Sequence, residues 1–246
     1  TDGHGTVESS TSSATTAVAN VNDAPNGGVT ITGTPAQNQV LTADTSSLAD
    51  ADGLGSLHYQ WQADGSNIGT DSNALTLTEA QVGKVITVVA SYVDGHGTPE
   101  NVTSSATVLV VNVNDAPTGS VTISGEATQG QTLTVANTLA DTDGLGTVHY
   151  QWQTSADGTS NWTDIASATG SSLTLTQNEA GWHLHVVASY TDGGGYAESV
   201  SSAVTGEVAH QGILVDSPVF GVEYHTATQT GITGNDGTFS YLSGET

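Results

Sequence analysis

Acidic residues at three recurring places in the sequence have the chemistry and the spacing of a site for a hard cation. In the first copy the candidate ligands are Asn22, Asp23, Asp50, Asp52 and Asp94. In the second copy they are Asn114, Asp115, Asp141, Asp143 and Asp192. Carboxylate and amide oxygens suit Ca²⁺, which takes six to eight oxygen ligands at about 2.3–2.6 Å. The pattern therefore predicts bound Ca²⁺ in each copy.

These candidate ligands come from three short segments that lie far apart in the sequence. Asn-Asp-Ala-Pro at 22–25 is followed by Asp-Ala-Asp-Gly at 50–53 and Asp-Gly-His-Gly at 94–97, and the second copy keeps this order. Asp-Gly pairs are also good turn residues without any metal. The joint recurrence of all three segments favours a metal site over turn chemistry alone.

Two stricter calcium motifs do not fit. An EF-hand loop that begins at Asp50 would place Trp61 at its twelfth position, where Glu is required. The Asp-Gly-Gly-Gly segment at 192–195 lacks the iterated nonapeptide of a calcium β-roll. The site is therefore expected to be assembled from separate loops.

The composition excludes several classes of partner. The chain carries one basic residue, Lys84, against 25 acidic residues, and its net charge is −24. A phosphate backbone or an anionic lipid surface would repel such a chain. We therefore do not expect nucleic acid as a partner. No apolar run reaches membrane-spanning length, so we do not expect membrane insertion either. Without Cys no disulfide framework is possible, and a divalent cation is the alternative staple.

Apolar and polar residues alternate along several short segments, which is the period-two pattern of half-buried strands. One face holds Ile86, Val88, Ala90 and Tyr92, and its counterpart holds Leu184, Val186, Ala188 and Tyr190. About seven such strands per repeat predict an all-β fold of tandem immunoglobulin-like antiparallel β-sandwich repeats, with Trp61 or Trp152 at the centre of the core. In that fold the incoming linker, the B–C loop and the F–G loop lie at one end, so the acidic segments should converge.

The recurring segments divide the chain into two full repeats with partial units on either side. Residues 1–20 are expected to be the C-terminal strand or strands of a preceding immunoglobulin-like repeat. Residues 21–112 form the first full repeat, and residues 113–211 form the second, which has a seven-residue insertion at about 155–161. Residues 212–246 differ, and we expect the incomplete start of a different surface repeat there. The sequence is therefore expected to be part of a longer protein.

The Val-Asn-Asp-Ala-Pro linkers, the Leu-Ala-Asp-x-Asp-Gly-Leu-Gly loops and the Tyr-Gln-Trp-Gln strands resemble the tandem repeats of giant bacterial adhesins. These are RTX or biofilm-associated proteins exported by type I secretion, and the resemblance covers about residues 1–211. The linker is also similar to the calcium-binding linker of cadherins. The resemblance implies Ca²⁺ between domains, an extracellular location at the bacterial cell surface or in secreted form, and a stalk or adhesive role.

Two glutamates are further candidate ligands. Glu79 and Glu179 come just past the fifth strand of their repeats, and they are expected at the pole opposite the acidic loops. From there a repeat would contribute an additional oxygen ligand to the junction that follows it.

The histidines are weaker candidates. His183 and His185 share a strand face and have the spacing of a transition-metal chelate, but that face is expected to point outward. His96 lies within an acidic segment, yet Gly194 takes its place in the second repeat, so we do not expect an essential ligand there.

The residues support two functional hypotheses. The first is a stalk in which each repeat is a spacer, its partners are the neighbouring repeats, and Ca²⁺ stiffens each junction. The second is an adhesive module for a host or surface glycan or protein, centred on the second repeat, where Trp162 in the insertion could stack on a ligand. No Gly-x-Ser-x-Gly nucleophile motif is present, so an enzyme is not expected.

Overall fold

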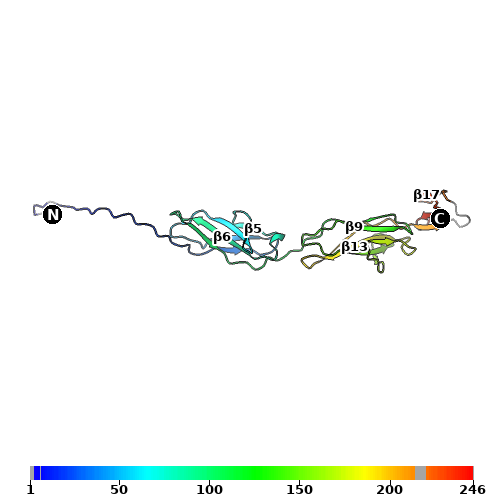
Figure 1. The fold of residues 1–246 in the computed structure, drawn as a ribbon, viewed down its shortest axis with the longest axis horizontal. Coiled ribbons are helices and arrows are strands. Elements are labelled where there is room, and N and C mark those ends of the chain that lie inside the picture. The colour runs from blue at the N-terminus through cyan, green and yellow to red at the C-terminus, as the bar shows by residue number, and fades with distance from the viewer. Residues whose placement is uncertain (1–2, 6, 214–219, 246) are drawn as a thin grey trace. The chain divides into compact units, whose positions relative to one another are not determined.

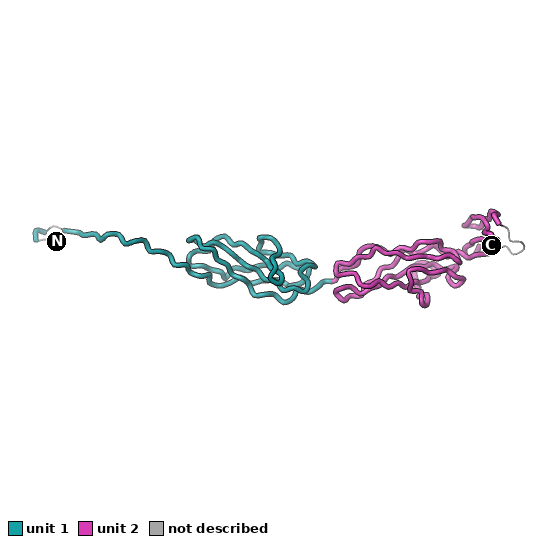
Figure 2. Tube along the Cα trace, in the orientation of Figure 1, with its two compact units in different colours: residues 1–113 teal, residues 114–246 magenta. Residues whose placement is uncertain are grey.

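The computed structural model describes residues 3–5, 7–213 and 220–245, and the chain forms two compact units, residues 1–113 and 114–246 (Figures 1 and 2). Asp2 of the first Asp-Gly-His-Gly segment lies outside the described residues, as do residues 214–219. In the described part of the chain, no helix is long and apolar enough to cross a membrane.

The first unit contains two antiparallel sheets. Its strands are β1 (Thr30–Thr32), β2 (Val40–Asp44), β3 (His58–Ala63), β4 (Ser66–Ile68), β5 (Ala74–Thr76), β6 (Ile86–Val93) and β7 (Pro99–Thr103). One sheet has the order β1-β2-β5 and the other β4-β3-β6-β7, and the short 3-10 helix η1 (Glu79–Gln81) joins β5 to β6. Residues 7–25 precede this sandwich and belong to no strand.

The second unit repeats this topology. Its strands are β8 (Val121–Ser124), β9 (Thr132–Asn137), β10 (His149–Ser155), β11 (Thr163–Asp164), β12 (Ser172–Thr174), β13 (His183–Thr191) and β14 (Ala197–Ser201). The sheet orders are β12-β9-β8 and β11-β10-β13-β14, and the all-β, immunoglobulin-like prediction is confirmed. Two further strand pairs follow: β15 (His210–Ile213) with β18 (Thr238–Tyr241), and β16 (Glu223–His225) with β17 (Thr230–Ile232).

A tryptophan lies at the centre of each core, as predicted. The side chains of Trp61 and Trp152 are fully buried among aliphatic residues of both sheets. Each indole N–H donates to a backbone oxygen, Trp61 to Ser72 at 2.8 Å and Trp152 to Gly170 at 3.0 Å. Because this donor is satisfied, the ring adds apolar burial without leaving an unpaired polar group.

The period-two pattern correctly predicts the inward face of the longest strands. Every second residue of β6 from Ile86 to Tyr92 is buried, and β13 repeats this from Leu184 to Tyr190. Strands β6 and β13 end directly before Asp94 and Asp192 respectively, so the buried strand carries each acidic loop to one end of the sandwich.

In each repeat the segment between the first two strands pairs in parallel with the segment that leaves the sandwich. In the first unit Gln37 donates its backbone N–H to Val111, and Val111 donates to Pro35, both at 2.9 Å. In the second unit Gln129 donates to Ala209, and Ala209 donates to Ala127, both at 2.8 Å. These bonds join the segment after the first strand to the last segment of each sandwich.

Glycines in the Leu-Gly part of the β2–β3 and β9–β10 loops allow a close backbone approach. A Cβ atom on Gly55 would fall 2.0 Å from the Val93 carbonyl oxygen, and one on Gly146 would fall 2.0 Å from that of Thr191. A real Cβ cannot come so near, so only glycine lets each loop lie against the end of β6 or β13. This contact brings two acidic segments to the same place.

We predict that Gly146→Ala destabilises the second repeat by about 2–4 kcal/mol, because the backbone must move away from Thr191. Denaturant unfolding of the chain, followed by tryptophan fluorescence, measures this loss. Gly206→Ala is the matched control, since a Cβ there meets nothing within 4 Å. Equal stability of the two variants would contradict the close-approach argument.

Candidate metal centre

The three acidic segments of the second repeat meet at one end of its sandwich. The backbone N–H of Asp115, in the linker, donates to Asp143 Oδ2 in the β9–β10 loop at 2.7 Å. Gly193, in the β13–β14 loop, donates its N–H to the Gly144 carbonyl at 3.1 Å. Linker and both loops are thus joined by hydrogen bonds, as the sequence predicted for this fold.

Hydrogen bonds hold the carboxylates at this end in place, but they use only some of the carboxylate oxygen atoms. Asp141 accepts from the Asp143 N–H at 2.9 Å and from the Tyr190 hydroxyl at 2.6 Å. Asp192 Oδ1 accepts from the Tyr196 N–H at 2.7 Å. The remaining oxygens, Asp143 Oδ1 and Asp192 Oδ2, are buried and have no hydrogen-bond partner among the described residues.

These oxygens form a compact group. One oxygen each from Asp141, Asp143 and Asp192 lies within 4.8 Å of the other two. Asp143 and Asp192 are only 8% and 6% exposed, so water screens their charges poorly. The second unit has no Lys or Arg in its sequence, because the one basic residue of the chain is Lys84. A bound cation fits this donor set, and the acidic cluster is a candidate metal site.

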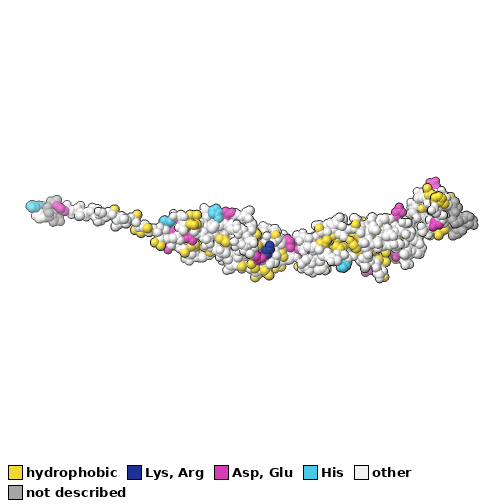
Figure 3. Space-filling model, viewed as in Figure 1, with side chains coloured by type: hydrophobic (Ala, Val, Ile, Leu, Met, Phe, Trp, Pro, Cys, Tyr) yellow, Lys and Arg dark blue, Asp and Glu magenta, His cyan; other side chains and the backbone are white. Residues whose placement is uncertain are grey.

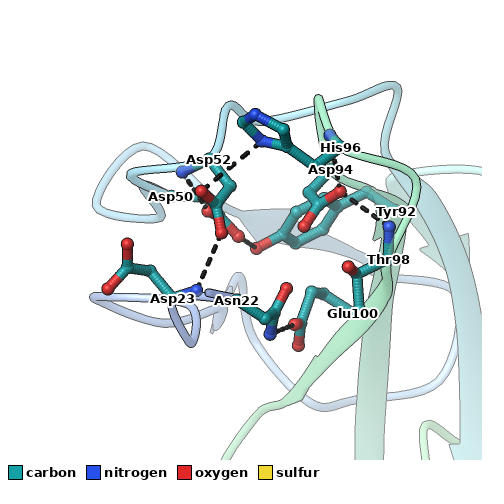
Figure 4. Close-up of polar contacts among 9 residues, drawn as sticks. All are labelled: Asn22, Asp23, Asp50, Asp52, Tyr92, Asp94, His96, Thr98 and Glu100. Atoms are coloured by element: carbon teal, nitrogen blue, oxygen red, sulfur yellow. Dashed lines mark hydrogen bonds and ion pairs between the residues drawn. The ribbon is translucent and has the colours of Figure 1, made fainter. Parts of the chain in front are cut away.

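The first repeat has a closely related end (Figure 4). The Asp23 N–H donates to Asp52 Oδ2 at 2.7 Å, the Asp52 N–H donates to Asp50 Oδ1 at 2.8 Å, and the Tyr92 hydroxyl donates to Asp50 Oδ2 at 2.6 Å. Asp94 is 6% exposed, and its Oδ2 has no hydrogen-bond partner within the described part of the chain.

Local contacts fix the ionisation of two groups in the first repeat. Burial raises the pKa of the Tyr92 phenol, and the Asp50 carboxylate raises it further, so the hydroxyl stays a donor. Burial of Asp94 opposes its ionisation, but the N–H groups of Thr98 and His96 outweigh burial and hold the pKa of this carboxyl below its usual value. Asp94 is therefore a carboxylate at neutral pH.

Two glutamates at this end, one in each repeat, were not anticipated as part of the site. Glu100 accepts from the Asn22 side-chain amide, and Glu198 accepts from that of Asn114, both at 2.7 Å. These amide nitrogens thus face glutamates, and the assignment of the two asparagines as metal ligands stays a prediction. The signal in the sequence was a Glu three residues after the Asp-Gly-x-Gly segment, which recurs in both repeats and at Glu8.

The two additional glutamate candidates lie at the other end of the long strands. Glu79 begins η1 in the first unit. Glu179 is buried, and its Oε2 accepts from the N–H and the hydroxyl of Thr176 at 2.8 and 2.7 Å. It precedes β13, whereas Asp192 follows β13, so the second unit does not bring these two carboxylates together. A metal role for Glu79 or Glu179 stays a prediction.

Trp162, the candidate ligand contact, stacks on its own repeat. Its ring lies 3.8 Å from the His185 ring at an interplanar angle of 8°. His185 was expected to point outward into solvent, but this stack covers it and leaves it 8% exposed. Its Nε2 lies 2.6 Å from Gln153 Oε1, and burial lowers its pKa. The ligand-binding role of Trp162 stays a prediction.

The loop that precedes Trp162 is organised by one carboxylate. Asp157 Oδ1 accepts from the N–H groups of Thr159 and Ser160 at 2.8 and 2.7 Å, and Oδ2 accepts from the Ser160 hydroxyl at 2.5 Å. These donors, with the Ser160 hydroxyl the strongest influence, hold the pKa of Asp157 far below its usual range. The ionised carboxylate therefore fixes the loop.

Comparison with known proteins finds similarity to solved structures only. The sequence matches no protein-family model, and no curated protein matches it. Similar solved structures include the three N-terminal domains of the bacteriophage RB49 Highly Immunogenic Outer Capsid protein, at 17% identity and a TM-score of 0.27, covering 89% of this chain and 70% of that one.

Two further solved structures are similar at the same level. A tetra-tandem repeat in the extending region of a large adhesion protein is 20% identical, with a TM-score of 0.24 over 87% of this chain and 65% of that one. The FN1-FN3 domains of chicken CNTN1 are 14% identical, with a TM-score of 0.29 over 90% and 89%. At these TM-scores the fold assignment rests on the chain's own strand pairing.

We predict that the amide ¹H shifts of Thr159 and Ser160 stay constant as the pH falls to about 4, the ordinary range of an Asp carboxyl. They should move only at lower pH, because a depressed pKa keeps the stabilising ionised form until that point. Asp157→Asn should move both shifts at neutral pH, whereas Asp164→Asn, on β11, should not. A titration of these amides centred near pH 4 would contradict the assignment.

Proposed function

We propose that the acidic end of each repeat binds Ca²⁺, and that the chain is a calcium-stabilised stalk region of an extracellular bacterial adhesin. The observation that carries the proposal is the pair of buried oxygens in the second repeat, Asp143 Oδ1 and Asp192 Oδ2, which lack a hydrogen-bond partner among the described residues. A buried carboxylate oxygen with neither donor nor counter-charge is strongly unfavourable unless a ligand satisfies it.

Calcium is the cation that fits this donor set best. The group formed by Asp141, Asp143 and Asp192 offers only oxygen, and oxygen ligands suit hard cations. Ca²⁺ accepts irregular sets of six to eight oxygens, whereas Mg²⁺ requires near-ideal octahedral geometry. Three carboxylates from two loops, with backbone carbonyls and water to complete the shell, match the more tolerant ion.

The stalk role follows from what the cation would connect. The ligand Asp143 also accepts the backbone N–H of Asp115, so the ion would secure the linker to both loops of its own repeat. Such a site does not exist in the unfolded chain, and the binding free energy therefore becomes stability. Extracellular calcium modules bind with dissociation constants of about 10⁻⁴–10⁻³ M, which fills them outside a cell.

The adhesin assignment rests on the type of chain. Tandem sandwiches, a net charge of −24, the absence of Cys and the resemblance of the linkers all suit a long surface protein whose repeats act as spacers. The proposal includes no catalytic step, and it assigns the neighbouring repeats as partners. Biofilm formation and type I secretion belong to the same proposal, whereas a host or surface ligand belongs to the alternative hypothesis of an adhesive module.

We predict that Ca²⁺ at 10 to 100 times its dissociation constant stabilises the second repeat by roughly 1.4–2.7 kcal/mol. Asp143→Asn should remove most of this gain, because it deletes one charged ligand. In chelator the same variant should melt at the same temperature as the wild type or higher, because Asn still accepts the Asp115 N–H while the crowded charge is reduced. Thermal unfolding with and without Ca²⁺ measures both effects.

The control for this experiment is Asp164→Asn, an exposed position on the edge strand β11, which should respond to Ca²⁺ as the wild type does. If Asp143→Asn lowers stability equally with Ca²⁺ and with chelator, the carboxylate is structural and the metal site is wrong.

We also predict that chelation increases the freedom of the linker between the repeats. Small-angle scattering at constant ionic strength should show a shorter mean maximum dimension in chelator than in Ca²⁺. Asp115→Asn combined with Asp143→Asn should give the chelated value even in Ca²⁺. If the melting temperature responds to Ca²⁺ but the scattering curve does not, the ion stabilises single repeats and the stiffening mechanism is incorrect.

A further inference from the structure

The two acidic ends differ at one chemically important position. Both loops have the sequence Asp-Gly-x-Gly, where x is His96 in the first repeat and Gly194 in the second. The two ends share the contact with the linker, since Asp52 and Asp143 both accept the N–H of a linker aspartate at 2.7 Å. The first repeat therefore has an imidazole in this loop where the second repeat has none.

The imidazole contacts the carboxylate oxygen that is left unpaired in the second repeat. His96 Nδ1 lies 3.5 Å from Asp52 Oδ1, and the side chain of Asp52 is only 5% exposed. The equivalent oxygen, Asp143 Oδ1, is buried and has no hydrogen-bond partner in the part of the second repeat that is described. Figure 4 shows the His96 ring and the Asp52 carboxylate extending toward each other from the two loops.

The carboxylates are also spaced differently. Asp141, Asp143 and Asp192 each place one oxygen within 4.8 Å of the other two, and among the described residues no such group of three includes Asp52. The second repeat therefore offers a compact set of oxygens, whereas in the first repeat a ring nitrogen lies beside one of them. A cation entering the first site must separate His96 from Asp52 before it can use that oxygen.

We propose that the residue between the two glycines of this loop sets the cation affinity of each repeat, so that Ca²⁺ fills the second repeat before the first. The inference rests on the proposed function, because it requires that both ends bind Ca²⁺. In the first repeat His96 competes with the ion for Asp52, whereas in the second repeat Gly194 leaves Asp143 open to the ion. We expect affinities that differ by about tenfold, which corresponds to 1.4 kcal/mol.

The reciprocal exchange of these two residues tests the proposal on the full chain. His96→Gly should raise the Ca²⁺ affinity of the weaker site, and Gly194→His should lower that of the tighter site, each by about tenfold in calorimetric titration. Glycine is already native at the equivalent position, and Gly194 does not have the left-handed backbone of Gly195, so both exchanges suit the loop. His96→Ala, which keeps a Cβ, should act like His96→Gly, and His225→Ala is the distant control.

The outcomes separate this inference from the proposed function. Asp143→Asn identifies the tighter site, because it should abolish that site alone. Two sites of equal affinity that do not respond to the exchange would overturn the inference and leave calcium binding intact. Weaker Ca²⁺ binding in His96→Gly, or Zn²⁺ binding that this variant loses, would show that His96 is a ligand and overturn it as well. The absence of Ca²⁺ binding at both sites would overturn the proposed function.

Discussion

Buried carboxylates gather at one end of each repeat, where the sequence supplies no Lys or Arg beside them. In the second repeat Asp143 and Asp192 are almost fully buried, yet the sequence of that unit contains no Lys or Arg. In the first repeat Lys84 precedes β6 and Asp94 follows it, so about 3.3 Å per strand residue separates them by roughly 30 Å. On the face that Figure 3 shows, acidic side chains recur along both units, whereas basic colour appears only in the first unit. The fold therefore gathers carboxylates without a Lys or Arg beside them, a setting that a bound cation would suit.

The gathering of carboxylates depends on close backbone approaches within these loops. Gly55 and Gly146 let one loop approach the end of the long buried strand, and Gly95 and Gly193 let the other approach a carbonyl of the first. The tyrosine hydroxyls near the ends of β6 and β13 donate hydrogen bonds that orient Asp50 and Asp141. In each repeat a hydrogen bond thus joins the end of the long buried strand to an acidic loop, so the strand end and the loop are positioned together.

The sequence predicts the fold well because its information is local and periodic. Alternation in β6 and β13 identifies the buried face, and the recurring acidic segments identify the loops that converge. Other contacts depend on side chains that meet only after folding, such as Asn22 with Glu100 or Trp162 with His185. No spacing rule gives these pairs. The contact of His96 with Asp52 is not predictable from the sequence either, because it depends on the distance between two loops.

The parallel pairing between the segment after the first strand and the last segment of each sandwich has a mechanical consequence. When a repeat is pulled by its two ends, the bonds that join Gln37 and Pro35 to Val111 lie across the line of force. They are strained together in shear and cannot be peeled apart one at a time. Gln129, Ala127 and Ala209 repeat the arrangement. A chain of such units would resist tension through a high barrier to unfolding, which is a property of rates and distinct from equilibrium stability.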